Sequence, residues 1–208
     1  MAPLTSQEQT FLTAQLLKLA KGGYFERGPF FAAEKSAERV SRTRCLYELA
    51  PREWRGSDYG RTHQIVRTYT DMYLRVYEVD CEDLHDLGTA QFLYELAPLL
   101  FDLEPSVRMH EIREDMFAKK LNINGVEYDF AAPLPTRFCG SEQCEFAAHS
   151  FRALADLLRK SGSNINAYVD LFGGNDTLVL FATTEQMEII KTIQHLLLER
   201  IPMEEVDW

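Results

Sequence analysis

The dipeptide Asn124-Gly125 is the feature of the sequence that most restricts its fold. It stands between two short β-prone runs, residues 121–123 and 126–130. A two-residue hairpin of type I′ needs positive φ at both central residues, and Asn followed by Gly adopts these angles most readily. We therefore predict an antiparallel β-hairpin over residues 121–130.

The start of the chain carries helical periodicity instead. Ser6 and Gln9 have the spacing of a capping box, and apolar residues then recur every three or four positions. This pattern predicts a helix over residues 5–21. We expect it to end at Gly22 and Gly23, because glycine adopts the left-handed conformation that follows many helices.

Three further helices are predicted before residue 104. Apolar spacing indicates one over residues 29–49 and another over 83–101, in which Pro98 is expected to kink or end the helix. Residues 65–79 also fit a helical period, although their Thr, Tyr and Val content suits a strand as well. We assign this last segment to a helix, with a strand as the alternative.

From Pro105 onward the pattern changes to strands alternating with helices. Residues 146–158 have the apolar spacing of a helix that is closed by Gly162. Thr183 and Gln186 have capping-box spacing at the start of a final helix. Between these helices a Gly-Gly-Asn-Asp turn predicts a second strand-turn-strand unit, with its strands at residues 165–172 and 177–182.

Together these patterns predict an α+β fold. A mainly helical portion occupies residues 1–104, and residues 105–208 have the order strand, β-hairpin, helix, β-hairpin, helix with an antiparallel sheet. The chain has 208 residues, of which 46% are hydrophobic and 26% charged, as is typical of one large or two small globular domains. We expect the two portions to pack as one contiguous unit.

The sequence also bears on location. No apolar stretch approaches the roughly 18 residues that a membrane-spanning helix needs, and the N-terminal residues lack the pattern of a secretory signal. We therefore expect a cytoplasmic protein with no membrane partner.

Four cysteines, at Cys45, Cys81, Cys139 and Cys144, are too few and too irregular for a disulfide framework, so we expect reduced thiols.

Charge is distributed unevenly along the chain, whose formal net charge is −10. Residues 18–75 hold twelve Lys and Arg residues against seven acids, whereas residues 78–115 hold eleven acids against two arginines. Such asymmetry bears on steering and on partners rather than on fold. A solvated surface or internal pairing of the two segments is the more common explanation, because exposed charge usually serves solubility, and we keep that interpretation beside the functional one.

The functional hypothesis is that acidic side chains of the middle segment imitate a phosphate track and dock on a basic protein, such as a nucleic-acid-binding protein. In this role the chain is a non-catalytic inhibitor or regulatory partner. Direct binding of nucleic acid is not expected, because the chain as a whole is acidic. The predicted partner-binding residues are Glu78, Asp80, Glu82, Asp83, Asp86 and Glu104.

The alternative is a small enzyme whose site is assembled from separated residues. The sequence contains no Walker loop, no H-E-x-x-H and no G-x-S-x-G, so no linear motif supports this alternative. The candidates for such a site are Cys144 with His110 or His149, and Asp170 or Asp176.

Metal binding by Cys139, Cys144 and His149 is a further hypothesis. Thiolates and imidazole suit zinc, but five-residue steps between these three residues are not those of a zinc knuckle, and a fourth ligand must come from a distant part of the chain. We therefore expect no metal and no cofactor.

Overall fold

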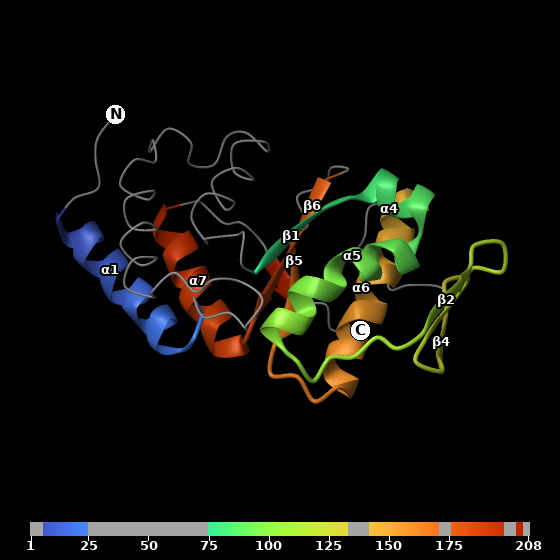
Figure 1. Ribbon diagram of the computed structural model, residues 1–208. Coiled ribbons are helices and arrows are strands. Elements are labelled where there is room, and N and C mark those ends of the chain that lie inside the picture. The colour runs from blue at the N-terminus through green and yellow to red at the C-terminus, as the bar shows by residue number, and fades with distance from the viewer. Residues whose placement is uncertain (1–5, 25–74, 133–141, 171–175, 198–202, 206–208) are drawn as a thin grey trace. The chain divides into compact units, whose positions relative to one another are not determined.

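The computed structural model describes residues 6–24, 75–132, 142–170, 176–197 and 203–205 (Figure 1). Within these ranges the chain is a mixture of helices and strands, which confirms the predicted α+β class. The elements in chain order are α1 (Ser6–Lys21), β1 (Val76–Asp80), α4 (Cys81–Leu87), α5 (Thr89–Leu103), β2 (Ile112–Asp115), β3 (Lys120–Ile123), β4 (Val126–Asp129), α6 (Glu142–Lys160), β5 (Asn166–Asp170), β6 (Asp176–Ala182), α7 (Thr184–Leu197) and β7 (Met203–Glu205).

By its internal contacts the chain divides into two compact units, and each is described here by itself. The first comprises Met1–Val76 and Ala182–Pro202, and the second comprises Tyr77–Phe181 and Met203–Trp208. This division concerns packing, whereas the predicted portions 1–104 and 105–208 concern secondary structure, so the predicted boundary stays a prediction.

In the first unit α1 packs against α7. Leu12, Leu16 and Leu19 form the buried side of α1, as their spacing of three and four residues requires. Met187 and Ile190 are buried apolar residues of α7 in this unit. Each helix therefore buries an apolar stripe, but in α1 this stripe does not include Ala14 and Leu17, which were expected to belong to it and are exposed.

The ends of these two helices follow local signals. The Thr183 N–H donates to Gln186 Oε1 at 3.0 Å, and the Gln186 N–H donates to Thr183 Oγ1 at 3.2 Å, which confirms the predicted capping box. Gly23 has a φ of 75° after α1, as expected for a glycine that ends a helix. Gln186 Nε2 also donates to the carbonyl oxygen of Gly22 at 2.8 Å, so the start of α7 is tied to the end of α1.

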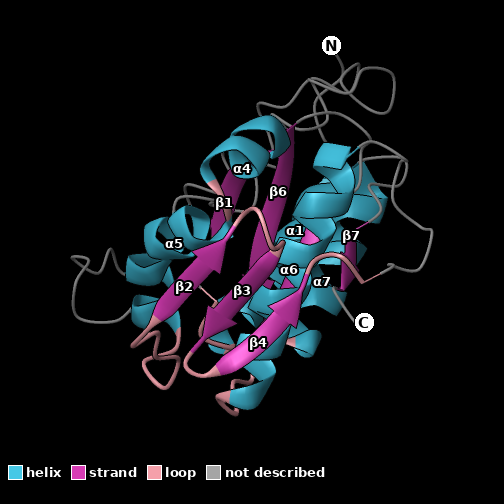
Figure 2. Cartoon of the chain, turned by 90° about the vertical axis from the view of Figure 1, so that its right-hand side faces the viewer, coloured by secondary structure: helices cyan, strands magenta, loops and turns pink. Residues whose placement is uncertain are grey.

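The second unit contains two sheets. One has the strand order β1-β6-β5-β7, with β5 and β7 antiparallel, and the other is antiparallel with the order β2-β3-β4 (Figure 2). The predicted hairpin is confirmed as β3 and β4, because Ile123 pairs with Val126 and both Asn124 and Gly125 have positive φ, 53° and 85°. β5 and β6 are neighbours in the other sheet, while their connection, residues 171–175, lies outside the described residues.

One hydrophobic core joins the helices and strands of the second unit. Leu93, Leu96 and Leu100 form the buried side of α5. The rings of Phe92 and Phe151 meet edge to face with their centroids 6.0 Å apart, which brings α5 against α6. The strands contribute further buried side chains to this core, among them Val79, Leu121, Ile123, Val169, Val179 and Phe181.

The helix predicted over residues 83–101 is in fact two helices, α4 and α5, separated by Gly88. Gly88 has φ 89° and ψ 161°, a combination that residues with a side chain rarely adopt. A Cβ atom at this position would lie 2.6 Å from Glu114 Oε2. Glycine is therefore required both by the backbone angle and by the close approach of Glu114 from β2.

Of the two predicted effects of Pro98, a kink or the end of the helix, the second is wrong, because α5 continues to Leu103. Pro98 lies with Tyr94 and Glu95 on the exposed side of the helix. The carbonyl group of Tyr94, which loses its intrahelical donor at Pro98, can therefore be hydrated. The buried leucines on the opposite side hold the last turn in the core.

The prediction of a helix over residues 65–79 is wrong in the part that the structure describes, because Val76–Asp80 forms the strand β1. β-branched side chains suit a strand that lies beside β6, and Val79 is buried in the core. The alternation that the sequence showed was therefore the correct signal. Residues 65–74 and the helix predicted over 29–49 lie outside the described residues.

α6 confirms the helix predicted around residues 146–158 and extends it at both ends. It closes at Gly162, which has a φ of 71° and donates its N–H to the carbonyl oxygen of Arg159 at 3.1 Å. None of the helices in the described residues is long and apolar enough to cross a membrane.

Candidate functional site

Asp80 lies at the junction of β1 and α4 and is the N-cap of that helix. Its Oδ1 accepts hydrogen bonds from the backbone N–H groups of Glu82 at 2.8 Å and Asp83 at 3.3 Å. The side chain is half-buried, and its second oxygen is not used by the cap. Asp80 therefore has a structural role besides any contact with a partner.

Glu82, Asp83 and Asp86 lie on the exposed side of α4, while Leu84 faces the core. The two acids in the first turn compensate the positive end of the helix. Asp86 Oδ1 lies 3.2 Å from His85 Nδ1 in an exposed contact. The structure thus places these three predicted residues together at the surface.

The other two predicted residues do not join this cluster. Glu104 follows the last turn of α5 and accepts a hydrogen bond from Ser106 Oγ at 2.8 Å. A helix of 15 residues is about 22 Å long, so Glu104 is separated from α4 by the full length of α5. Glu78 lies on β1, and its side chain lies outside the described part of the structure.

A groove of about 190 Å³ runs beside α4, and we call it the α4 groove. Its carboxylates are those of Asp80, Asp83 and Glu95, and none of the ten described residues that line it is Lys, Arg or His. The remaining lining is apolar or uncharged: Tyr77, Val79, Leu84, Leu87, Gly88, Gln91 and Phe92. Leu87 is 64% exposed, so apolar surface is available at the mouth of the groove.

Glu95 joins this groove through contacts that sequence reasoning did not find. Its Oε2 accepts a hydrogen bond from Tyr77 Oη at 2.5 Å, and its Oε1 accepts one from Gln91 Nε2 at 2.8 Å. These two hydrogen bonds, that of Tyr77 first, hold the pKa of Glu95 below its usual value. The group is therefore a fixed carboxylate at neutral pH.

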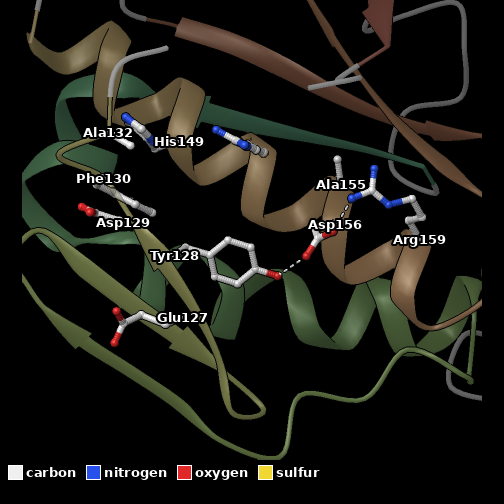
Figure 3. A pocket seen from close by; sticks show the side chains of 10 residues that line it. Glu127, Tyr128, Asp129, Phe130, Ala132, His149, Ala155, Asp156 and Arg159 are labelled. Carbon is white, nitrogen blue, oxygen red and sulfur yellow. Dashed lines mark hydrogen bonds and ion pairs between the residues drawn. The ribbon is translucent and has the colours of Figure 1, made fainter.

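A second hollow, of about 330 Å³, lies between β4 and α6, and we call it the β4–α6 pocket (Figure 3). β4 and the residues after it supply one wall, through Glu127, Tyr128, Asp129, Phe130 and Ala132. α6 supplies the other, through His149, Arg152, Ala155, Asp156 and Arg159, whose spacing of three and four residues places them on one helical face.

Asp156 is the most heavily bonded charge of this pocket. Its Oδ2 accepts a hydrogen bond from Tyr128 Oη at 2.6 Å and lies 2.7 Å from Lys160 Nζ, while its Oδ1 pairs with Arg159 (Figure 3). Burial alone raises the pKa of this carboxyl, but the hydrogen bonds from Lys160, Tyr128 and Arg159 together hold it below its usual value. Asp156 therefore fastens α6 to β4 as a carboxylate.

His149 lies at the other end of the same helical face and is only 3% exposed. Its ring stacks on Phe130 with centroids 4.9 Å apart and an angle of 14°. Burial, together with the charge of Arg152, lowers the pKa of the imidazole against the opposing effects of Glu145, Asp129 and a backbone hydrogen bond at Ala132. Within the described residues His149 Nε2 is buried and has no hydrogen-bond partner.

The described residues of the alternative enzymatic hypothesis are Cys144, His110 and His149. Cys144 is disulfide-bonded, which corrects the expectation of a reduced thiol and removes the proposed nucleophile. His110 is exposed on the segment before β2, and its backbone N–H donates to Asn124 Oδ1 at 2.7 Å. The side chains of Asp170 and Asp176 lie outside the described residues.

Cys139 lies outside the described residues too, so metal binding by Cys139, Cys144 and His149 together is not tested. Among the residues that the structure describes, no group of three or more His, Cys, Asp or Glu side chains is arranged to hold a metal ion.

Comparison with known proteins found no relative of this chain. No family model matches the chain, and no curated protein or solved structure matches it.

Proposed function

We propose that the α4 groove binds a basic segment of a protein partner, and that the chain acts as a non-catalytic inhibitory or regulatory partner of that protein. The observation that carries this proposal is the composition of the groove, with three carboxylates and no cation among its ten described lining residues. Asp80 and Asp83 belong to the acidic residues that the sequence predicted, and Glu95 adds a third.

A lysine or arginine side chain has an apolar stem and a charged end, and the groove offers a suitable surface to each. The aliphatic stem packs on Leu84, Leu87 and Phe92, while the charged end meets the carboxylates at the rim. Because these carboxylates are partly solvated, each ion pair contributes little, and affinity depends on several basic residues of the partner binding together.

The charge of the surrounding segment supports fast association with such a partner. Residues 78–115 contain eleven acids and two arginines, so a basic protein is attracted from a distance and the attraction weakens as salt is added. A protein with a basic groove, such as one that binds nucleic acid, has the complementary charge.

The cytoplasmic location expected from the sequence stays part of the proposal, but one of its arguments is lost. Disulfides persist mainly in oxidising compartments, and Cys144 is disulfide-bonded. Mass spectrometry of Cys144 in protein isolated under rapid alkylation tests the location independently of the groove.

Neutral substitutions at the rim test the groove itself. We expect Asp83→Asn combined with Glu95→Gln to weaken the binding of a fluorescent peptide of alternating lysine and alanine about three- to tenfold at low ionic strength. Fluorescence anisotropy measures the affinity, and circular dichroism checks that the fold is retained.

The matched control is Glu185→Gln combined with Glu188→Gln, which removes the same charge from exposed positions on α7. This control should keep its affinity within about twofold, since it changes net charge alone. Equal loss in both double variants means that net charge and not the groove holds the peptide. That result, or no loss in either variant, overturns the proposal.

A further inference from the structure

Exposed apolar side chains adjoin the mouth of the α4 groove, and we call Leu87, Met116 and Phe117 the apolar rim. Leu87 lines the groove, while Met116 and Phe117 lie in the turn between β2 and β3. Met116 is 43% exposed and Phe117 is fully exposed. Of the five large apolar or aromatic side chains that are exposed in the described ranges, three belong to this rim. Single exposed apolar residues are common, whereas several together indicate a surface that binds a partner.

Met116 joins the turn to the end of α4. A Cβ atom at Gly88 would lie 3.2 Å from Met116 Sδ, and Gly88 follows Leu87 and itself lines the groove. Figure 2 shows β2 ending close to α4. The apolar turn therefore continues the surface of the groove beyond Leu87.

The backbone of this turn is held in place. The Ala118 N–H donates to Asp115 Oδ1 at 2.9 Å, and the carbonyl oxygen of Lys119 accepts a hydrogen bond from the Phe130 N–H at 2.8 Å. The side chain of Phe117 is thus presented from an ordered segment, which lowers the entropic cost of binding a partner there.

The two lysines that follow Ala118 are paired with acids. Lys119 Nζ lies 3.6 Å from Glu142 Oε1, and Lys120 Nζ lies 2.7 Å from Glu127 Oε1. Basic residues beside an exposed aromatic side chain attract anionic lipid, but these ion pairs offset that attraction. They also reduce the repulsion of a basic peptide, so the rim suits a protein partner better than a membrane.

The carboxylates of the groove and the apolar rim follow one another along α4. Asp80, Asp83 and Leu87 are spaced by three and four residues, and all of them line the groove. At 1.5 Å per residue Asp80 and Leu87 are about 10 Å apart along the helix, a distance that about three residues of an extended chain span.

We propose that the partner segment bound in the α4 groove carries a large apolar side chain about three residues from its basic residues, and that this side chain packs on the apolar rim. The inference rests on the proposed function and adds an anchor to it. The carboxylates attract the segment, whereas burial of the anchor supplies affinity that partly solvated ion pairs do not.

Two fluorescent peptides test the anchor on the full chain. One is the peptide of alternating lysine and alanine, and the other has its central alanine replaced by tryptophan, which then stands three positions from a lysine on either side. We expect the wild type to bind the tryptophan peptide at least about fivefold more tightly in fluorescence anisotropy. This ratio should persist as salt is added, because burial of apolar surface is not screened.

Met116→Ser combined with Phe117→Ser should bring the two peptides within about twofold of each other and leave the affinity for the lysine–alanine peptide unchanged. Phe117→Ser alone changes a fully exposed side chain and should remove at least half of the preference. Leu17→Ser is the matched control, since Leu17 is exposed on α1 and is not among the lining residues of the groove; it should keep the full preference. Circular dichroism checks that each variant is folded.

The Asp83→Asn, Glu95→Gln variant separates this inference from the proposed function, because it should weaken both peptides by a similar factor and keep their ratio. No preference for tryptophan in the wild type, or a preference that persists in the Met116→Ser, Phe117→Ser variant, overturns the anchor and leaves the basic groove standing. If the acidic variant binds both peptides as the wild type does, the proposed function fails and the anchor with it.

Other occupants of the rim give different results. Sedimentation of the wild type and the Met116→Ser, Phe117→Ser variant detects a second copy of the chain, and flotation with phosphatidylserine vesicles detects a membrane. A dimer or a vesicle-bound form that is lost in this variant assigns the rim to that occupant and overturns the proposal.

Discussion

The carboxylate of Glu114 on β2 caps the helix that begins at Thr89, with Glu114 Oε1 accepting a hydrogen bond from the Thr89 N–H at 3.0 Å. Its Oε2 accepts a second one, from the Ala90 N–H at 2.8 Å. The N-cap residue of α5 is Gly88, which has no side chain to do this. A residue 25 positions further along the chain therefore satisfies the start of the helix and joins β2 to α5.

Replacing Glu114 by Ala should lower the free energy of unfolding by about 1–2 kcal/mol, because two backbone N–H groups of α5 lose their acceptor. Urea denaturation followed by circular dichroism measures the change. Glu111→Ala is the control: Glu111 is exposed and its side chain pairs with Arg113 among the described residues, so its loss should cost about 0.5 kcal/mol or less. Equal costs for the two variants would contradict the capping role.

Replacing Gly88 by Ala should cost about 2–3 kcal/mol, because the new Cβ meets Glu114 Oε2 at 2.6 Å and the backbone has a φ of 89°. Gly125→Ala is a matched control, with a φ of 85° but no atom within 4 Å of the new Cβ. It should cost only about 1 kcal/mol of backbone strain. If the two variants unfold at the same urea concentration, the contact with Glu114 does not restrict residue 88.

Asp156 should contribute to the loss of stability in acid. Its pKa is lowered in the folded protein, so its contribution is complete above the unfolded value of about 3.9 and is lost as the pH falls through the folded value. Asp156→Asn should therefore be less stable than the wild type at neutral pH and should show a shallower decline below about pH 4. Parallel curves of unfolding free energy against pH in the two proteins would contradict this assignment.

Tyr128→Phe separates the hydrogen bond from the packing of the ring. The substitution removes the Tyr128 Oη donor that lies 2.6 Å from Asp156 Oδ2, and it should lower stability by about 1 kcal/mol at neutral pH. Combined with Asp156→Asn, it should cost less than the two single changes added together, since both remove the same bond. Full additivity in urea denaturation would show that the two residues are not coupled.

His149 should make stability depend on pH at higher pH values than Asp156 does. Burial lowers its pKa in the folded state, so the unfolded state binds a proton more readily. Stability should be complete above the unfolded value of about 6.5 and should decline as the pH falls below it, down to the folded pKa. His149→Gln should remove this decline, and calorimetric melting in that range measures it; a decline that persists unchanged in the variant has another cause.

Signals that act within a few residues were sufficient to predict much of the fold. The capping box at Thr183 and the glycine that closes α6 depend on contacts between near neighbours, and a helix begins at Ser6, where capping-box spacing predicted one. The strand β1 was missed because Met72, Val76 and Val79 fit a helical period, while Met72, Leu74 and Val76 also alternate as in a strand. Only the neighbouring strand β6 decides between the two.

The candidate sites were less accessible to sequence reasoning. The acids of α4 were found because they are adjacent in sequence, whereas Glu95 was not, since its bond to Tyr77 spans 18 positions. The spacing of His149, Arg152 and Asp156 already places them on one face of a helix, which is a usable signal. The β4 residues that lie across the pocket from them cannot be predicted from that spacing.

What the sequence determined by itself is local: the Asn124-Gly125 turn, the glycines after α1 and α6, the cap of α7, and the surplus of acids in residues 78–115. Tertiary structure alone decided that Gly88 divides one apolar segment into two helices, and that Tyr128 of β4 and Asp156 of α6 meet at one hollow. The physical reason is the separation along the sequence over which each interaction acts. Backbone angles and caps are set by a few bonded neighbours, but the contact between Glu114 and α5 and the walls of a pocket exist only after distant segments have packed together.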